Sequence, residues 1–187
     1  VEVEAARLSF DVSFDADFQW VKDSKLHGLS PERKVTGGRD RRPDGWSARV
    51  MFGKDGICLN YLYDQDETKK YGTGGRSREP VFVKDRWHRV TLQVQLNEPG
   101  KKNGFAHLFV DGERAVANDS VEFRGEGGSK TLIQYLLFST FHGGSSPSWA
   151  PVDKDGKPTT VHACFDNFVV TQGIHDPVMA EPKPRIP

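Results

Sequence analysis

The chain lacks long hydrophobic runs and has no excess of charge of one sign. No stretch approaches the roughly 20 apolar residues that a membrane-spanning helix needs. Its 26 lysine and arginine residues equal its 26 aspartate and glutamate residues, so no global field draws it to nucleic acid or to a membrane surface. We therefore expect neither of those partners, and a polyanion has to be recognised by a local patch.

Cysteine is also scarce. The two cysteines, Cys58 and Cys164, are too few for a disulfide framework, and no Cys or His cluster has the spacing of zinc ligands. We expect two buried free thiols, while a bond between them stays open. The glycine pairs at 37–38 and 74–75 lack the strand-to-helix context of a phosphate loop, which argues against nucleotide binding.

Strand patterning is abundant where helical periodicity is missing. Alternating or apolar runs recur along the chain, separated by clusters of proline, glycine, asparagine and aspartate. The predicted strands cover residues 7–14, 46–52, 59–63, 81–83, 88–96, 104–110, 115–123, 132–141 and 161–170. This pattern predicts an all-β fold, an antiparallel β-sandwich of the jelly-roll or concanavalin-like kind.

The length of 187 residues fits one domain with a substantial core. We assign residues 1–173 to this domain, which we expect to be monomeric. Residues 174–187 contain four prolines, and we expect this tail to lie over the surface or to be frayed. The chain begins at Val1 rather than at methionine, so we expect a processed product that is secreted or periplasmic.

Two short predicted strands carry the clearest functional signal. Side chains alternate between sheet faces, so Ser47 and Arg49 share a face of the first strand, and Tyr61 and Tyr63 share a face of the second. The four residues between the strands predict a hairpin turn that would place them side by side. Together with Lys25 upstream, this surface has the chemistry of an anion-binding catalytic face. An ordinary exposed sheet face would use the same residue types.

Further polar groups flank this face. Gln93 and Gln134 are buried-side amides that either contact substrate or satisfy backbone groups. The run at 132–141 is apolar on both faces, as expected of a central strand. The polar segments 25–45 and 64–80 contain many lysines and arginines, and they form either a cationic rim or solvated loops.

Six short segments stand in an order and spacing that resembles a known group of enzymes. They are Lys-Leu-His-Gly-Leu from Lys25, Gly-Trp-Ser-Ala-Arg-Val-Met-Phe from Gly45, Tyr-Leu-Tyr from Tyr61, Leu-Asn-Glu-Pro-Gly from Leu96, Phe-Ser-Thr-Phe-His-Gly-Gly from Phe138 and Phe-Asp-Asn-Phe from Phe165. Together they resemble the jelly-roll polysaccharide lyases of families 14 and 20, which include alginate and glucuronan lyases. His27 replaces the proline usual there, and His142 replaces a common phenylalanine, which leaves the substrate open.

The resemblance implies β-elimination on a uronic-acid polymer, alginate or glucuronan. Arg49 would neutralise the substrate carboxylate as the C5 proton leaves. Tyr61 and Tyr63 would transfer protons in an order that stays open. Lys25 would either act as the base or stabilise the charge that develops. The expected substrate-binding residues are Ser47, Gln93, Gln134 and His142.

This chemistry needs no metal or other cofactor. Glu4 and Asp166 form a candidate structural calcium site, since hard oxygen ligands suit Ca²⁺. Alternatively, Asp166 and the adjacent Asn167 cap a turn.

Two other classes of function stay open. A non-catalytic carbohydrate-binding module of the same fold would also use arginine and tyrosine, because fold alone does not give activity. A glycoside hydrolase would need two carboxylates across the scissile bond. The candidate face supplies none, because Asp64 alternates to the side opposite Tyr61 and Tyr63. The sequence chooses neither among the uronate polymers nor between endo and exo cleavage.

Overall fold

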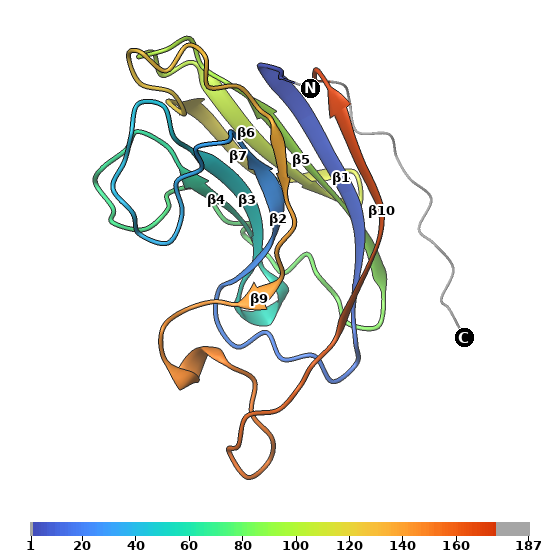
Figure 1. Cartoon of the computed structure of the whole chain (residues 1–187). Coiled ribbons are helices and arrows are strands. Elements are labelled where there is room, and N and C mark those ends of the chain that lie inside the picture. Colours follow the sequence, from blue (N-terminus) through green and yellow to red (C-terminus); the bar gives the residue numbers. More distant parts are fainter. Residues whose placement is uncertain (1, 175–187) are drawn as a thin grey trace.

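The structure is a computed structural model, and the residues that it describes are 2–174. From residue 175 onward the proline-rich tail lies outside the described residues. Two antiparallel sheets pack face to face (Figure 1), which confirms the predicted β-sandwich. One sheet has the strand order β10-β1-β5-β6-β7, and the other has the order β4-β3-β2-β8, with the short β9 also paired to β2. The strands are β1 (Ala5–Phe14), β2 (Ser24–Ser30), β3 (Ser47–Phe52), β4 (Cys58–Tyr63), β5 (Trp87–Gln95), β6 (Gly104–Val110), β7 (Glu113–Val121), β8 (Tyr135–Leu137), β9 (Phe141–His142) and β10 (Ala163–Gln172).

Alternating side chains account for the way the two sheets pack. In β5 the predicted apolar face is buried, with Val90, Leu92 and Val94 fully inaccessible to solvent. The turn between β6 and β7 is Asp111-Gly112, and both residues have positive φ, 52° and 86°. Two such residues in succession are typical of tight turns that match the twist of a hairpin. The core therefore lies between the sheets, where apolar residues of both meet.

Three predictions about strands are wrong. Residues 24–30, expected to begin a polar loop, form β2 at the centre of its sheet between β3 and β8. Residues 81–83 form no strand. The run 132–141, expected to be a central strand, holds only the short edge strand β8 and part of β9. Tyr135 of β8 and Phe138 just after it are exposed, so this segment is not covered on both faces as a central strand would be.

Aromatic rings fill the end of the core that lies near η1 (Lys54–Gly56). Phe14 is central to this cluster, with its ring centroid 4.8 Å from that of Phe18 and 4.7 Å from that of Trp20. Phe52 of β3 joins from the opposite sheet at 5.5 Å. Edge-to-face pairs of this kind contribute about 0.5–1.5 kcal/mol each beyond burial. The cluster fixes the sheet that carries β2 and β3 against the other one.

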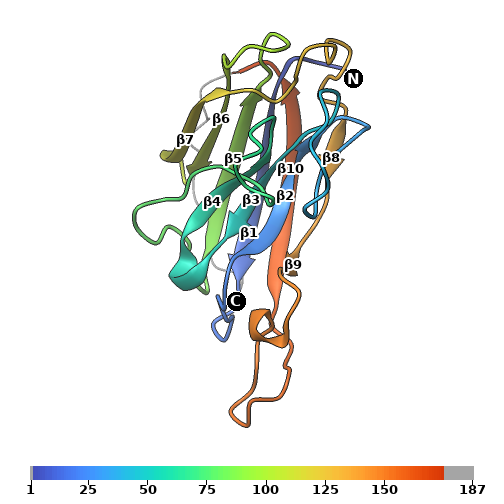
Figure 2. The same ribbon diagram turned by 90° about the vertical axis from the view of Figure 1, so that its left-hand side faces the viewer.

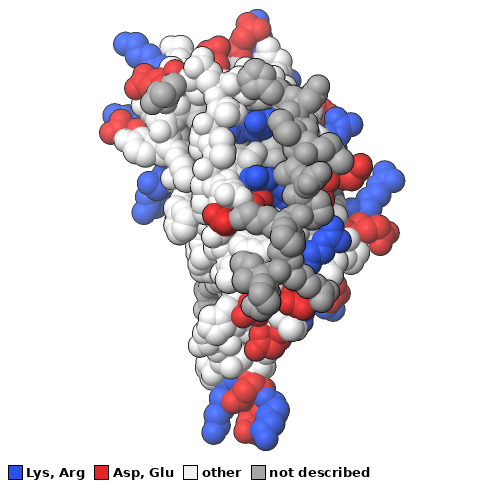
Figure 3. Space-filling model, turned by 90° about the vertical axis from the view of Figure 1, so that its right-hand side faces the viewer, with Lys and Arg blue, Asp and Glu red and all other residues white. Residues whose placement is uncertain are grey.

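The surface agrees with the balanced composition. On the side shown in Figure 3, lysine and arginine side chains lie among aspartate and glutamate side chains. Within residues 2–174, no helix has the length and apolar character needed to span a membrane.

Candidate active site

The β3–β4 hairpin brings the candidate side chains together as the sequence predicts. Ser47 pairs with Tyr63, and Arg49 pairs with Tyr61. Because directly paired residues of antiparallel strands point to the same face, all four side chains belong to one face of the sheet. Figure 2 looks onto this side of the molecule, where β4, β3 and β2 lie in front.

Lys25 reaches the same face from β2, on the other side of β3. It pairs with Met51, two residues along β3 from Arg49. Its Nζ lies 4.9 Å from the centroid of the Tyr61 ring. Burial lowers the pKa of Lys25, the nearby Arg49 charge lowers it further, and Asp23 opposes both effects. The amine is therefore closer to its neutral form than an exposed lysine would be.

Gly28 makes room for the Arg49 side chain. These two residues pair across β2 and β3, and a Cβ at Gly28 would lie 2.5 Å from Arg49 Cγ and 2.2 Å from the Ala48 carbonyl oxygen. Arg49 is only 7% exposed, and its guanidinium carbon lies 5.7 Å from the Tyr61 ring centroid. The buried Nε has no hydrogen-bond partner among the described residues. A guanidinium group that is shielded from water in this way can form two parallel hydrogen bonds to a carboxylate.

The two tyrosines form a coupled pair of hydroxyl groups. Tyr61 Oη and Tyr63 Oη share a hydrogen bond of 3.2 Å, and Tyr63 Oη accepts a second bond of 2.7 Å from the Gly38 backbone N–H. Tyr63 is fully buried, whereas Tyr61 is half-buried. Burial, followed by the hydrogen bond with Tyr63, raises the pKa of Tyr61 to about 12. Tyr61 is thus a neutral phenol that faces the site, with Tyr63 behind it.

Arg41, one of the cations of the predicted rim, joins two loops over this end of the sheet, a role that the sequence analysis did not assign to it. Its Nε donates to the Asp66 carbonyl oxygen at 3.3 Å, and its Nη2 donates to the carbonyl oxygens of Lys69 and Tyr71 at 3.4 Å each. Its guanidinium carbon also lies 4.4 Å from the Tyr63 ring centroid, within the range of a cation–π contact. Part of the predicted cationic rim is therefore a link between loops. No periodic signal in the sequence marks such a link.

Ser47 does not have the position expected of a substrate-binding residue. Its side chain is fully buried, and its hydroxyl donates to the Val35 carbonyl oxygen at 2.7 Å. The bond holds the segment after β2 onto the sheet. The segment that contains Val35 therefore covers Ser47, and its hydroxyl is unavailable at the surface.

Gln93 and His142 lie away from the tyrosines. Gln93 belongs to β5 in the opposite sheet, and it alternates to the side opposite the core-facing Leu92. His142 points to the core side of β9, where its ring centroid lies 5.6 Å from Phe18 and its Nε2 lies 3.0 Å from the Gln19 carbonyl oxygen. Alternation indicates which face a side chain occupies but not which sheet or neighbour adjoins that face. The structure therefore places neither residue beside Tyr61 and Tyr63, where the sequence analysis expected a contact with substrate.

Gln134 lies directly before β8, and both polar atoms of its side-chain amide are hydrogen-bonded. Its Oε1 accepts from the Glu32 backbone N–H at 2.9 Å, and its Nε2 donates to Glu2 Oε1 at 2.9 Å. The amide thus performs the alternative role, satisfying neighbouring polar groups.

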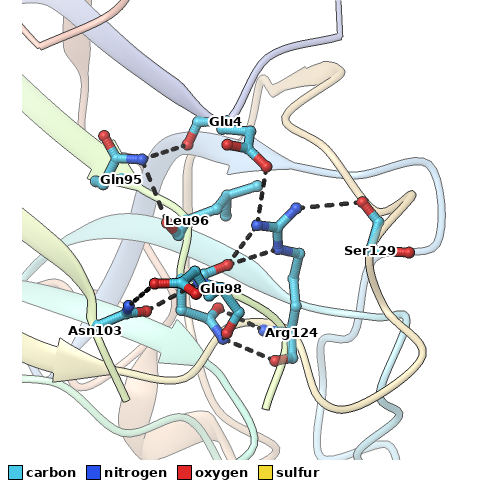
Figure 4. A network of polar contacts seen from close by, with 8 residues as sticks. Glu4, Gln95, Leu96, Glu98, Asn103, Arg124 and Ser129 are labelled. Carbon is cyan, nitrogen blue, oxygen red and sulfur yellow. Dashed lines mark hydrogen bonds and ion pairs between the residues drawn. The ribbon is translucent and has the colours of Figure 1, made fainter. Parts of the chain in front are cut away.

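The proposed calcium ligands are too far apart to share an ion. Asp166 pairs with Asp11 in the β1–β10 register, whereas Glu4 precedes β1, seven residues away and therefore more than about 20 Å distant. Glu4 instead accepts from Arg124 Nη2 at 3.2 Å, in the polar network of Figure 4. Among residues 2–174, no group of three or more His, Cys, Asp or Glu side chains is placed to hold a metal ion.

The remaining expectations concern sulfur and acid groups. Cys58 and Cys164 are both free thiols, but only Cys58 is buried, and burial raises its pKa to about 11. The Asp64 carboxylate accepts from the Thr73 hydroxyl at 2.9 Å and is largely buried. It fixes the loop that follows β4.

Comparisons with known proteins agree with this geometry. The profile of the family described as Polysaccharide lyase 14 matches residues 1–168. The solved PL-14 alginate lyase of Aplysia kurodai is 25% identical, with a TM-score of 0.75 over 92% of this chain and 71% of that one. An alginate lyase of a Chlorella virus is 20% identical, with a TM-score of 0.74 over 92% and 73%.

A more distant structural likeness is the endo-β-1,4-glucuronan lyase of the fungus Trichoderma reesei. It is 14% identical, with a TM-score of 0.59 over 94% of this chain and 72% of that one. No curated protein matches the chain. The match to the family profile spans nearly the whole sandwich and all the residues grouped around Tyr61, and on this basis the chain belongs to the polysaccharide lyase 14 family.

Proposed function

We propose that the protein cleaves an alginate-like or glucuronan-like polymer by β-elimination at the Tyr61 face. Membership of the family makes it a polysaccharide lyase acting on an acidic polysaccharide. The observation that carries the assignment of the site is the convergence of two cations on one neutral phenol. Lys25 Nζ lies 4.9 Å and Arg49 Cζ lies 5.7 Å from the Tyr61 ring centroid.

Arg49 is the group that neutralises the substrate carboxylate. Removing the C5 proton of a uronate shifts negative charge onto the adjacent carboxylate, so a cation fixed in advance lowers the barrier. The guanidinium is nearly buried and keeps its charge at any ordinary pH, and its Nε is a donor without a partner among the residues described. This preorganisation costs no solvent rearrangement when the charge develops.

Lys25 and Tyr61 divide the proton transfers. Lys25, whose pKa is lowered, takes the C5 proton as a neutral amine, and the electrons of that C–H bond form the C4=C5 double bond. The C4–O4 bond breaks, and O4 takes the proton of Tyr61, whose pKa of about 12 keeps the phenol protonated beforehand. Near neutral pH the two groups thus hold the protons that the steps need, a protonated phenol for O4 and an amine shifted toward its neutral form for the C5 proton.

Tyr63 stabilises the phenolate that Tyr61 becomes. Its hydroxyl is bonded to Tyr61 Oη, and its own oxygen accepts from the Gly38 N–H. Donation through this chain spreads the negative charge over two hydroxyls and one backbone amide. Tyr63 is therefore a positioning residue, and Tyr61 is the one that contacts substrate.

The similar solved enzymes support the choice of polymers. They include lyases named for alginate and one named for β-1,4-glucuronan. A carbohydrate-binding module would use the same arginine and tyrosines but would release no product.

The test is the ultraviolet absorbance of unsaturated uronate during incubation with polymannuronate, polyguluronate and glucuronan separately. Absorbance should rise on at least one polymer, and Tyr61→Phe should reduce the rate by about 10²-fold or more, as loss of a general acid does. Tyr135→Phe, at the exposed edge strand β8, is the matched control and should keep the wild-type rate. Binding without any product would favour the carbohydrate-binding alternative.

A further inference from the structure

A hollow of about 450 Å³ opens beside the Lys25 end of the sheet. It lies between the segment before β2, the η1 turn and the loop that carries η2 (Pro147–Trp149), the two short helical turns at the lower end of Figures 1 and 2. Its lining includes Lys22, Lys54, Arg76 and Trp149. The mechanism described above uses none of these residues.

The hollow continues the face that carries the active site. Lys25 pairs with Met51, Met51 pairs with Leu59, and Leu59 bridges to Arg76. Arg76 thus ends the row of side chains that begins with Lys25. Arg76 Nη2 also lies 3.2 Å from an oxygen of Asp23, and both residues line the hollow.

The contacts of Asp23 indicate the distance between the hollow and the reacting groups. A Cβ at Gly53 would lie 2.8 Å from Asp23 Oδ1, so Asp23 lies over the residue of the hairpin four positions after Arg49. Four residues of strand correspond to about 13 Å. A Cβ at Gly143 would lie 2.7 Å from Lys25 Nζ and 3.1 Å from the Asp23 carbonyl oxygen, so Gly143 packs against both Lys25 of the site and Asp23 of the hollow. A polymer bound at Arg49 therefore has the hollow within reach of its neighbouring sugar units.

Trp149 gives the hollow an aromatic surface held in a fixed place. A Cβ at Gly144 would lie 2.2 Å from Trp149 Cγ, so the ring rests on the glycine backbone, which has a φ of 96°. Lys22 Nζ lies 5.2 Å from the ring centroid and donates to Ser148 Oγ at 2.9 Å. The exposed Lys22 side chain lies over the ring, so a sugar ring stacks on the indole when Lys22 turns away from it toward the carboxylate of the sugar.

The charges of the hollow favour an anionic ligand. Arg76 is paired with Asp23, but both side chains are exposed, 60% and 38%, and ion pairs of this kind contribute little and exchange readily. Lys54 has no ion-pair partner among residues 2–174. With Lys22, three cations face the two aspartates Asp23 and Asp55 of the lining.

We propose that this hollow is an outer subsite that binds a uronate unit of the polymer, with Trp149 under the sugar ring and Lys22, Lys54 or Arg76 at its carboxylate. The subsite rests on the proposed function, because it takes a more distant part of the same substrate. Its binding energy holds the polymer without touching the bond that breaks. It therefore affects KM for long chains and leaves kcat unchanged.

The first experiment measures KM and kcat for saturated uronate oligomers of increasing length and for the polymer that the wild-type enzyme cleaves best. Trp149→Ala and the pair Lys22→Ala with Lys54→Ala should raise KM for the polymer by about five- to tenfold. Both should leave kcat, and kcat/KM for the shortest cleaved oligomer, unchanged. Lys157→Ala, an exposed change in the same long loop, is the control and should behave as wild type.

A binding experiment keeps this inference separate from the proposed function. Two proteins are compared, the Tyr61→Phe variant and the same variant with Trp149→Phe. The difference between their tryptophan fluorescence signals is the contribution of Trp149. Uronate oligomers should change that difference signal, and a neutral β-1,4-glucan of equal length should not. Product formation by wild type with no effect of Trp149→Ala on KM, and no fluorescence change, would refute the subsite. Absence of product on every polyuronate, with the fluorescence change intact, would refute the proposed function and retain the subsite.

Discussion

His27 should make the fold sensitive to mild acid. The residue is fully buried, and its Nδ1 accepts from the Ser139 backbone N–H at 3.1 Å, so the proton of the neutral ring is on Nε2. That Nε2 has no hydrogen-bond partner among the residues described. The ring lies among phenylalanines, with centroid distances of 4.9 Å to Phe10 and 4.7 Å to Phe165. A charge at this position would be neither hydrated nor paired.

The size of the effect follows from the titration of the ring in the two states. Burial lowers the pKa of His27 from 6.5 to about 4, so between these values the unfolded chain binds a proton that the folded protein excludes. Stability is therefore complete above pH 6.5 and is lost as the pH falls toward 4. At pH 4.5 the linkage amounts to about 2 kcal/mol relative to pH 7.

Urea unfolding at pH 7 and pH 4.5 measures this loss. The His27→Leu variant loses the bond from Ser139 at both pH values, so its stability at pH 7 falls. The further fall between pH 7 and pH 4.5 should be about 2 kcal/mol smaller in the variant than in wild type. His162→Gln, at an exposed histidine, should show the wild-type pH dependence. Equal losses in wild type and His27→Leu would refute the argument.

Four further predictions follow from the contacts. Gly28→Ala should lower kcat/KM by about 10²-fold, because its Cβ would displace the Arg49 side chain; unchanged kinetics with an intact fold would contradict this role of the glycine. Arg41→Lys should retain more activity than Arg41→Gln, and the pH profile of kcat should differ between the two, because the cation lies over the Tyr63 ring; coincident profiles would reduce Arg41 to a structural link. Arg124→Met should lower the free energy of unfolding by about 3 kcal/mol, measured in urea at pH 7, because it leaves the Asn97 carbonyl and Glu4 without their buried donor. Since protein cations supply the charge, dialysis against a chelator should leave the initial rate unchanged, and a loss restored by Ca²⁺ would show that a metal is required.

The sequence was a good guide wherever two neighbouring strands alternate cleanly. The β3–β4 pair has the predicted hairpin register, and Arg49, Tyr61 and Tyr63 meet as expected. β2 was missed because lysine, histidine and glycine are poor strand formers on their own. Its position is decided by partners on both sides, β3 and β8, and such long-range pairing leaves no local pattern.

The site residues divide by the same logic. Period-two alternation fixes the face of a side chain, which suffices for Arg49 and Tyr61. It does not indicate what lies above that face, and so Ser47 was expected at the surface although the segment containing Val35 covers it. Gly28 could have been found, because a glycine inside a strand often marks a close approach of another group. Arg41 acts through three carbonyl groups of another loop, a contact that no single-chain pattern encodes.

The two cations of the site also explain how a protein without net charge can act on a polyanion. Burial and then the Arg49 charge lower the pKa of Lys25, so in the free enzyme both favour the neutral amine that the proposed mechanism needs as a base. A uronate carboxylate bound to Arg49 offsets the repulsion between the two cations and stabilises the ammonium that forms when the C5 proton is transferred. The neutral amine of Lys25 is thus favoured before substrate binds, and its ammonium form is stabilised once the substrate carboxylate is bound. Lys25→Arg would remove this effect, because a guanidinium stays protonated at working pH, so the variant should bind polymer and release no product.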